Sequence, residues 1–212
     1  MQTAERHLEG IAALIVDWDG TVVDNTSARH AALQAALAPH GIDVPADRYR
    51  RLAGLPVCDV IAALVAGVGF VPVEDVVARS RAALLGGPAP APIACALDLL
   101  HAARRLDIPR AVSSSAAAVL VHHGIRLLGL AELLPVIVTA DDVPCGKPAP
   151  DSYLEAAHRL GVDPALCLAV DDAADGIAAA QSAGMRTLTI RGGRLAVPAP
   201  ATSTGGPRAA QP

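Results

Sequence analysis

The sequence predicts an α/β fold in which a parallel sheet carries helices on both faces. Short apolar runs of strand length alternate along the chain with stretches of helical character, a pattern typical of successive βαβ units. The run at residues 11–16 is apolar throughout, as expected for a parallel strand that is buried on both faces. Further strands are expected at residues 109–113, 135–138, 166–170 and 186–190.

Two of the intervening helices have recognisable boundaries. Ser152 and Glu155 have the spacing of a capping box at a helix N-terminus, and Gly161 follows as a C-terminal stop. Another helix is expected over residues 173–183, ending at Gly184. These helices supply the crossover connections that a parallel sheet requires.

The segment between the first and second strands is far longer than one crossover helix needs. We therefore expect a helical cap with hinges at residues 25–92, inserted into a core formed by residues 1–24 and 93–191. The expected cap helices and returning linker are residues 27–39, 46–53, 59–66, 74–85 and 86–92. Residues 192–212, rich in Pro, Ala and Gly without periodicity, are expected to form a disordered tail.

Composition excludes several classes of function. A chain of 212 residues with a formal net charge of -4 lacks the basic field of a nucleic-acid binder. Its four cysteines form no C-x-x-C pair, which argues against a zinc or redox motif. No run is long enough to cross a membrane or resembles a signal peptide. We expect a cytoplasmic monomer or weak dimer that binds neither nucleic acid nor membrane.

Polar side chains stand at or just beyond the ends of the expected strands. In a parallel α/β sheet these ends converge on one crevice, and carboxylate, hydroxyl and ammonium groups that meet there suit phosphoryl transfer with a metal. Several carboxylates cannot crowd together without a cation, and an oxygen-only set favours Mg²⁺. The residues are Asp17, Asp19, Ser114, Lys147, Asp171 and Asp172.

These residues suggest a division of roles on a small phosphomonoester. Once Mg²⁺ and Lys147 neutralise the phosphate, the carboxylate of Asp17 can approach it in line as the nucleophile. A second group must protonate the leaving alkoxide and later deprotonate water, and Asp19 is the candidate.

The phosphate oxygens also need hydrogen-bond donors. The turn after the first strand, including Trp18 and Gly20, can direct backbone N–H groups at them. Within the run 113–115, strand length favours Ser114 as the hydroxyl donor, with Ser115 as a further contact.

These residues carry a family resemblance. Residues 17–24, D-W-D-G-T-V-V-D, resemble the D-x-D-G-T-x-x-D signature of the haloacid dehalogenase superfamily. Ser114, the G-K-P-A-P-D run at 146–151, and Asp171-Asp172 followed by Gly176 resemble its other motifs, in the same order. The resemblance spans about residues 11–191. The placement of the expected cap between the first and second motifs is similar to that in the beta-phosphoglucomutase and phosphoglycolate phosphatase branch.

The resemblance implies a Rossmann-like core, a cap that opens and closes, and a phosphatase with an aspartyl-phosphate intermediate. It implies Mg²⁺ held by the Asp17 carboxylate, the Asp19 backbone carbonyl and Asp172, with Asp171 bonding directly or through water. Asp171 departs from the pattern because many members have Glu there. The Pro-rich tail also stands where relatives add a strand, so one sheet edge is expected to be exposed or differently covered.

Four alternatives remain. A phosphosugar mutase uses the same intermediate, but mutases of that branch carry His and Arg where this chain has Arg29 and Val57. A phosphoaccepting signalling receiver has its acidic pair before the acceptor and no inserted cap. A dehalogenase lacks the second Asp and the metal pair. A binding or regulatory protein could keep the fold without chemistry, yet every expected catalytic residue type is present.

Overall fold

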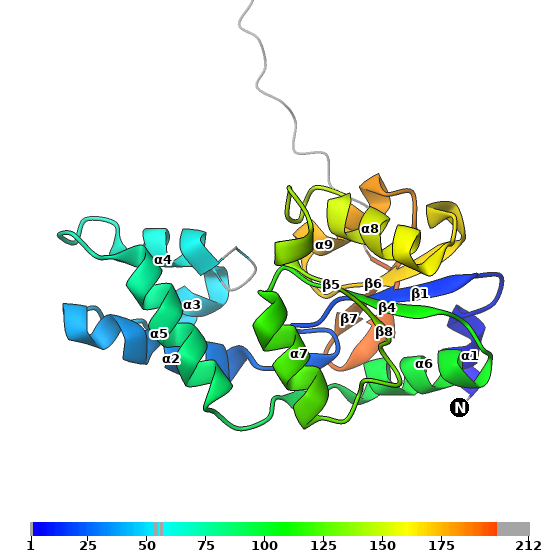
Figure 1. The fold of residues 1–212 in the computed structure, drawn as a ribbon, viewed down its shortest axis with the longest axis horizontal. Coiled ribbons are helices and arrows are strands. Elements are labelled where there is room, and N and C mark those ends of the chain that lie inside the picture. Colours follow the sequence, from blue (N-terminus) through cyan, green and yellow to red (C-terminus); the bar gives the residue numbers. More distant parts are fainter. Residues whose placement is uncertain (1, 53–54, 56, 199–212) are drawn as a thin grey trace, which may run out of the picture.

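The computed structural model describes residues 2–52, 55 and 57–198, and a mixed sheet lies among α1 and α6 to α9 on one side of this part of the chain (Figure 1). The strand order is β5-β4-β1-β6-β7-β8. The strands are β1 (Ala13–Val16), β4 (Arg110–Ser113), β5 (Val136–Val138), β6 (Cys167–Val170), β7 (Arg186–Arg191) and β8 (Arg194–Ala196). The first five run parallel and β8 runs antiparallel to β7. The α/β fold is confirmed.

The register of the central strands brings the expected site residues to one edge. Val16, the last residue of β1, lies opposite Val112 of β4 on one side and Val170 of β6 on the other. The residues that follow these strands therefore meet at the same edge of the sheet. Asp17 and Asp171 each lie one residue beyond their strand.

Helices cover both faces of the sheet, and the alternation within β1 explains why. Leu14 and Val16 belong to one apolar cluster, whereas Ala13 and Ile15 belong to another on the opposite face. The first cluster includes residues of α6 (Ala94–Arg105) and α7 (Ala118–Leu127), beside which α1 (Gln2–His7) packs against α6. The second includes residues of α8 (Asp151–Leu160) and α9 (Ala174–Ser182).

A helical unit at residues 26–85 lies to one side of the sheet (Figure 1). Its helices are α2 (Thr26–Leu37), α3 (Ala46–Leu52), α4 (Val57–Val65) and α5 (Val73–Leu85), and they enclose an apolar cluster of their own. The short antiparallel pair β2 (Val23–Asp24) and β3 (Ala91–Pro92) joins this unit to the sheet. The unit therefore enters and leaves through adjacent segments.

The prediction of an unstructured tail from residue 192 was wrong for β8. Gly192 and Gly193, with φ of 56° and 72°, form a two-residue turn that returns the chain antiparallel to β7. Leu195 lies opposite Ile190, so β8 takes the place of the additional strand that seemed to be missing. Three residues carry too little periodicity to indicate a strand by themselves. The rest of the predicted tail, residues 199–212, lies outside the described residues.

The predicted capping box at Ser152 was also wrong. Helix α8 begins at Asp151, one residue earlier, with Pro150 at its N-cap and no side-chain cap. Ser152 is instead 2% exposed and its hydroxyl accepts a hydrogen bond from the Ser113 hydroxyl at 3.0 Å. The short 3-10 helices lie at Ala38–His40, Ala140–Asp142 and Pro164–Leu166. Within the described ranges, no helix is both long enough and apolar enough to span a bilayer.

Candidate active site

Asp17 stands at the centre of the edge where β1, β4 and β6 end. Its backbone N–H donates to the carbonyl of Val170 at 2.9 Å, which extends the pairing of β1 with β6 by one residue. The residue is 7% exposed. A carboxylate is thus held by the sheet itself at the floor of the site.

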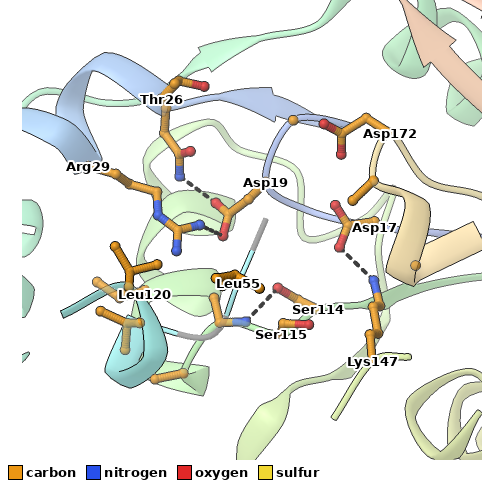
Figure 2. Close-up of a pocket in the computed structure, with 18 of the residues that line it drawn as sticks. Asp17, Asp19, Thr26, Arg29, Leu55, Ser114, Ser115, Leu120, Lys147 and Asp172 are labelled. Carbon is orange, nitrogen blue, oxygen red and sulfur yellow. Dashed lines mark hydrogen bonds and ion pairs between the residues drawn. The ribbon is translucent and has the colours of Figure 1, made fainter. Parts of the chain in front are cut away.

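Lys147, the only lysine in the sequence, joins the ends of three strands. Its Nζ lies 2.7 Å from Asp17 Oδ1, 2.7 Å from Asp171 Oδ2 and 2.9 Å from the carbonyl oxygen of Ser113. An ammonium has three donors, and each has an acceptor here. Figure 2 shows the Lys147 side chain directed at Asp17. The predicted convergence of Asp17, Lys147 and Asp171 is observed.

Tyr153 is a site residue that the sequence reasoning missed. This fully buried side chain of α8 donates its hydroxyl to Asp171 Oδ2 at 2.8 Å, and its ring centroid lies 4.9 Å from Lys147 Nζ. The backbone N–H of Ala173 donates to Asp171 Oδ1 at 2.9 Å. The one available signal was a tyrosine on the helix after the lysine motif, in a chain that is only 2% aromatic.

Asp172 lies on the open side of the same cluster. Its backbone N–H donates to the Thr21 hydroxyl at 3.1 Å, and that hydroxyl lies 3.3 Å from Asp172 Oδ1. Carboxylate oxygens of Asp17, Asp171 and Asp172 come within 4.8 Å of one another. The residues that follow β1 and β6 therefore place three carboxylates close together.

The donor set fits a hard divalent cation. Three carboxylates face a single ammonium, so one positive charge does not balance the cluster. Asp171 already accepts bonds on both oxygens. Among the described residues, the second oxygens of Asp17 and Asp172 accept no hydrogen bond. An all-oxygen site with two such ligands suits Mg²⁺.

Burial and mutual repulsion shift the pKa values of these groups. Burial raises the pKa of Asp17 well above its usual value, against the opposing effect of Lys147. Burial, with the charge of Asp171, raises the pKa of Asp172 to about 6. Burial opposes the charged form of Lys147, but Asp17 and Asp171 outweigh it and raise the pKa of the ammonium. Added positive charge would keep the carboxylates ionised.

Two glycines make room for the acidic cluster. A Cβ on Gly20, whose φ is 86°, would lie 2.3 Å from Asp172 Oδ2, and one on Gly176 would lie 1.9 Å from Asp171 Oδ2. The N–H of Gly20 donates to the Val23 carbonyl at 2.7 Å. This bond is internal to the turn, so the expected contact of that N–H with phosphate is not supported.

Of the other residues expected to contact phosphate, some line the cavity and others have buried side chains elsewhere. Ser114 lies 1% exposed at the end of β4, lines the cavity described below, and accepts a bond from the Ala116 N–H at 3.1 Å. Ser115 is exposed and also lines that cavity. Ser113 instead faces Ser152. The Trp18 side chain is buried, and its ring packs so closely on Gly124 that a Cβ there would lie 2.6 Å from it.

The Asp19 carboxylate points away from Asp17. Figure 2 shows it directed at Arg29, whose Nη1 lies 2.6 Å from Asp19 Oδ2. Asn25 Nδ2 donates to the other oxygen. The expected proton-transfer residue thus lies in the site, but its side chain contacts the start of α2. Neither Arg29 nor Asn25 was among the residues predicted for the site.

A cavity of about 460 Å³ lies between the strand ends and the helical unit. Asp17, Lys147 and Asp172 line its floor, and Tyr49, Arg50 and other residues of α3 to α5 line its opposite wall. Only some side chains of the basic segment at residues 48–51 reach this cavity. Arg48 donates to the Ala63 carbonyl and Arg51 pairs with Asp47, whereas Tyr49 and Arg50 reach the cavity.

Comparison with known proteins agrees with this site. A model of the haloacid dehalogenase-like hydrolases matches residues 11–184. The validoxylamine A 7'-phosphate phosphatase of Streptomyces hygroscopicus subsp. limoneus is 31% identical, with 81% of each chain covered. The fructose-1-phosphate phosphatase of Escherichia coli is 31% identical, with 86% of this chain and 98% of the relative covered.

A solved structure shares the architecture. CbbY from Rhodobacter sphaeroides, in a complex with xylulose-(1,5)-bisphosphate, superposes with a TM-score of 0.75 at 26% identity, covering 84% of this chain and 85% of that chain. The chain therefore belongs to the haloacid dehalogenase-like hydrolases and, like its phosphatase relatives, is a phosphomonoester hydrolase.

Proposed function

We propose that this protein is a Mg²⁺-dependent phosphatase that hydrolyses a sugar phosphate or a similar small phosphomonoester through an aspartyl phosphate on Asp17. The observation that carries the proposal is the bridge from Asp17 through Lys147 to Asp171, beside Asp172, at the floor of one cavity. A nucleophilic carboxylate, a cation and a metal-binding pair are the parts that phosphoryl transfer requires.

In the first step, an Asp17 carboxylate oxygen attacks phosphorus in line with the ester oxygen. The new O–P bond forms as the bond to the leaving alkoxide breaks, and Asp19 supplies the proton that this alkoxide takes up. Lys147 stabilises the charge on the transferring oxygens, with the Ser114 hydroxyl as a further donor. The product is an acyl phosphate on Asp17 and a free alcohol.

In the second step, Asp19 removes a proton from water, which attacks the phosphorus of the acyl phosphate. The Asp17–phosphorus bond breaks, and Asp17 and inorganic phosphate are released. When bound, Mg²⁺ would supply positive charge that stabilises the phosphate. Asp17, Asp172 and the Asp19 backbone carbonyl would hold it, with Asp171 positioned between Lys147 and Tyr153.

We assign the helical unit the role of a cap that selects the substrate. It lines the cavity with residues of all four of its helices, including Arg29, Tyr49 and Arg81. The relatives support a hydroxyl-rich substrate, since two are named for validoxylamine A 7'-phosphate and for fructose 1-phosphate. The structural relative holds a pentulose bisphosphate.

The test is phosphate release from a panel of phosphorylated sugars and cyclitols, with and without Mg²⁺. Wild-type protein should release phosphate only with the metal, and Asp17→Asn should lose at least about a thousandfold in kcat. Asp98→Asn, which changes an exposed carboxylate of α6, is the matched control. Activity that survives Asp17→Asn would exclude Asp17 as the nucleophile.

The same assay separates hydrolysis from a mutase reaction. A hydrolase converts a sugar phosphate into free sugar and inorganic phosphate in equal amounts. A mutase returns the phosphoryl group to sugar and yields an isomeric phosphate. Accumulation of an isomer without phosphate would exclude the proposed reaction.

A further inference from the structure

The two donors that hold Asp19 both come from the start of α2. Asn25 directly precedes this helix and Arg29 lies near its N-terminus. Arg29 Nη1 is 2.6 Å from Asp19 Oδ2, and Asn25 Nδ2 donates to Oδ1. Each oxygen of the carboxylate therefore has a donor that belongs to the entrance of the helical unit. The motif residues around Asp17 provide neither donor.

This ion pair is shielded from solvent. The side chains of Arg29 and Asp19 are 27% and 19% exposed, and the buried side chain of Tyr49 lies beside Arg29. Guanidinium and primary amide nitrogens can only donate. If Asp19 turned away with nothing in its place, two shielded donors would lose their acceptor, which is costly in free energy.

Proton transfer at the ester oxygen nevertheless requires an Asp19 oxygen to face that atom, and both oxygens face donors at the start of α2 instead. The carboxylate oxygens of Asp17, Asp171 and Asp172 lie within 4.8 Å of one another, and the Asp19 carboxylate is not part of this cluster. Figure 2 shows the Asp19 carboxylate directed at α2 and that of Asp17 directed at Lys147. The donors on α2 therefore need a substitute acceptor when Asp19 acts.

The substrate is positioned to supply that acceptor. Arg29 and Asn25 line the same cavity as Asp17 and Lys147. A molecule whose phosphate lies at Asp17 would therefore share this cavity with both donors. Resting on the phosphatase function proposed above, we propose that Arg29 is an exchange residue: it holds Asp19 in the free enzyme and passes to oxygen atoms of the substrate's non-phosphate part as Asp19 turns toward the phosphate.

This exchange links substrate choice to the availability of the proton donor. A polyhydroxylated ester offers oxygens to Arg29 and Asn25, so Asp19 is released without leaving them unpaired. A hydrocarbon ester offers none, so its phosphate meets an enzyme whose Asp19 still points at α2. Arg29 is then a specificity-determining residue for hydroxyl-rich esters, acting partly through Asp19.

The test compares fructose 1-phosphate with n-butyl phosphate, which both release a primary alkoxide and differ in hydroxyl groups. Arg29→Met removes the guanidinium and keeps a long side chain. We expect kcat/KM for fructose 1-phosphate to fall about tenfold or more and that for butyl phosphate to stay level or rise. A fall of less than threefold in the ratio of the two values overturns the proposal.

Two further variants separate this role from a general structural one. Arg29→Lys keeps the charge and should restore part of the preference for fructose 1-phosphate. Arg51→Met removes an exposed arginine that pairs with Asp47 on the surface of α3, and it should leave the ratio unchanged. An equal loss with both esters in Arg29→Met, or no recovery in Arg29→Lys, contradicts the exchange.

p-Nitrophenyl phosphate tests whether Arg29 acts through Asp19. Its leaving group departs without a proton donor, and kcat/KM reports steps only through phosphoryl transfer to the enzyme. We expect Arg29→Met to change this kcat/KM less than threefold. A loss as large as that with fructose 1-phosphate would show that Arg29 does not work by exchange with Asp19.

A crystal structure gives a readout independent of rate. Asp17→Asn protein with bound fructose 1-phosphate should show the Arg29 guanidinium within hydrogen-bond distance of a sugar oxygen, and the Asp19 carboxylate turned toward the ester oxygen. An intact Arg29–Asp19 pair in that complex would overturn the proposal. The proposed function fails separately, if no ester yields phosphate or if Asp17→Asn keeps its activity.

Discussion

Lys147 Nζ and Asp17 Oδ1 are 2.7 Å apart, although 130 positions separate the two residues in the chain. The same ammonium contacts Asp171 at 2.7 Å, so one side chain joins the residues that follow β1 and β6. Because the lysine pairs with two buried carboxylates at once, its removal should affect both stability and catalysis.

Lys147→Met should destabilise the metal-free protein by about 3–5 kcal/mol at pH 7, because it leaves the carboxylates of Asp17 and Asp171 buried without their partner. Urea unfolding measures the change, and activity should be lost. The folded-state pKa of Asp17, already raised by burial, would rise further, so the deficit should shrink as the pH falls toward 5. An unfolding free energy equal to that of wild type would contradict the ion-pair account.

Tyr153→Phe should lower kcat about tenfold with little change in KM. The variant removes the hydroxyl that donates to Asp171 Oδ2 and keeps the ring beside Lys147. The lost hydrogen bond to a charged group should cost about 1.5–3 kcal/mol of unfolding free energy. Tyr153→Leu, which also removes the ring, should be worse in both measurements. Unchanged kcat in Tyr153→Phe would mean that Asp171 keeps its position without the hydroxyl.

Mg²⁺ affinity should fall steeply below pH 6. The pKa of Asp172 is raised to about 6 by burial and by Asp171, and a carboxyl group must lose its proton to bind the metal. Above pH 6 Asp172 is ionised and adds no further pH dependence to the Mg²⁺ affinity. Below pH 6 its bound proton costs about tenfold in affinity per pH unit. Isothermal titration of Mg²⁺ between pH 5 and 7.5 measures this.

Linkage gives the stability of the metal-free protein the opposite pH trend. Because the folded-state pKa of Asp172 lies above its unfolded value of 3.8, the folded state binds more protons between about pH 4 and 6. The contribution of this group to stability is therefore greatest at low pH and is lost as the pH rises through 6. In Asp172→Asn the decline in stability between about pH 4 and 6 should disappear, and a pH-independent Mg²⁺ affinity in wild type would refute the assignment.

Gly176→Ala should impair both folding and activity. The added Cβ would lie 1.9 Å from Asp171 Oδ2, so either the carboxylate or helix α9 has to move. We expect a loss of about 1–3 kcal/mol in unfolding free energy, together with reduced kcat because Asp171 is displaced from Lys147. Gly69→Ala is the control, since no described heavy atom lies within 4 Å of its added Cβ. Equal stability of the two variants would contradict the close approach.

The expected strands were close to those observed because each is a local apolar run. Residues 166–170 were predicted and β6 spans Cys167–Val170; residues 109–113 were predicted and β4 spans Arg110–Ser113. A parallel strand buried on both faces needs no information beyond its own composition. β8 was missed because Arg194–Ala196 becomes a strand only through pairing with β7.

The convergence of Asp17, Asp171 and Asp172 was predictable for a topological reason, whereas Lys147 reaches them from the segment between β5 and α8. Parallel strands of one sheet place their carboxyl ends at one edge, so polar residues at those ends must meet even when the chain between them is long. The roles of Ser114 and Asp19 remain predictions, although both residues line the cavity. Residue order and motif spacing were sufficient to predict which acidic residues meet at the site.

The sequence by itself therefore determined the fold class, the family and the acidic and basic groups at the strand ends, because local composition and strand order are written along the chain. Only the tertiary structure decided that Tyr153 supports Asp171 and that Arg29 and Asn25 hold Asp19. Those contacts depend on side-chain directions that are set when α8 packs on a face of the sheet and α2 packs within the helical unit, and they have no signature in spacing alone.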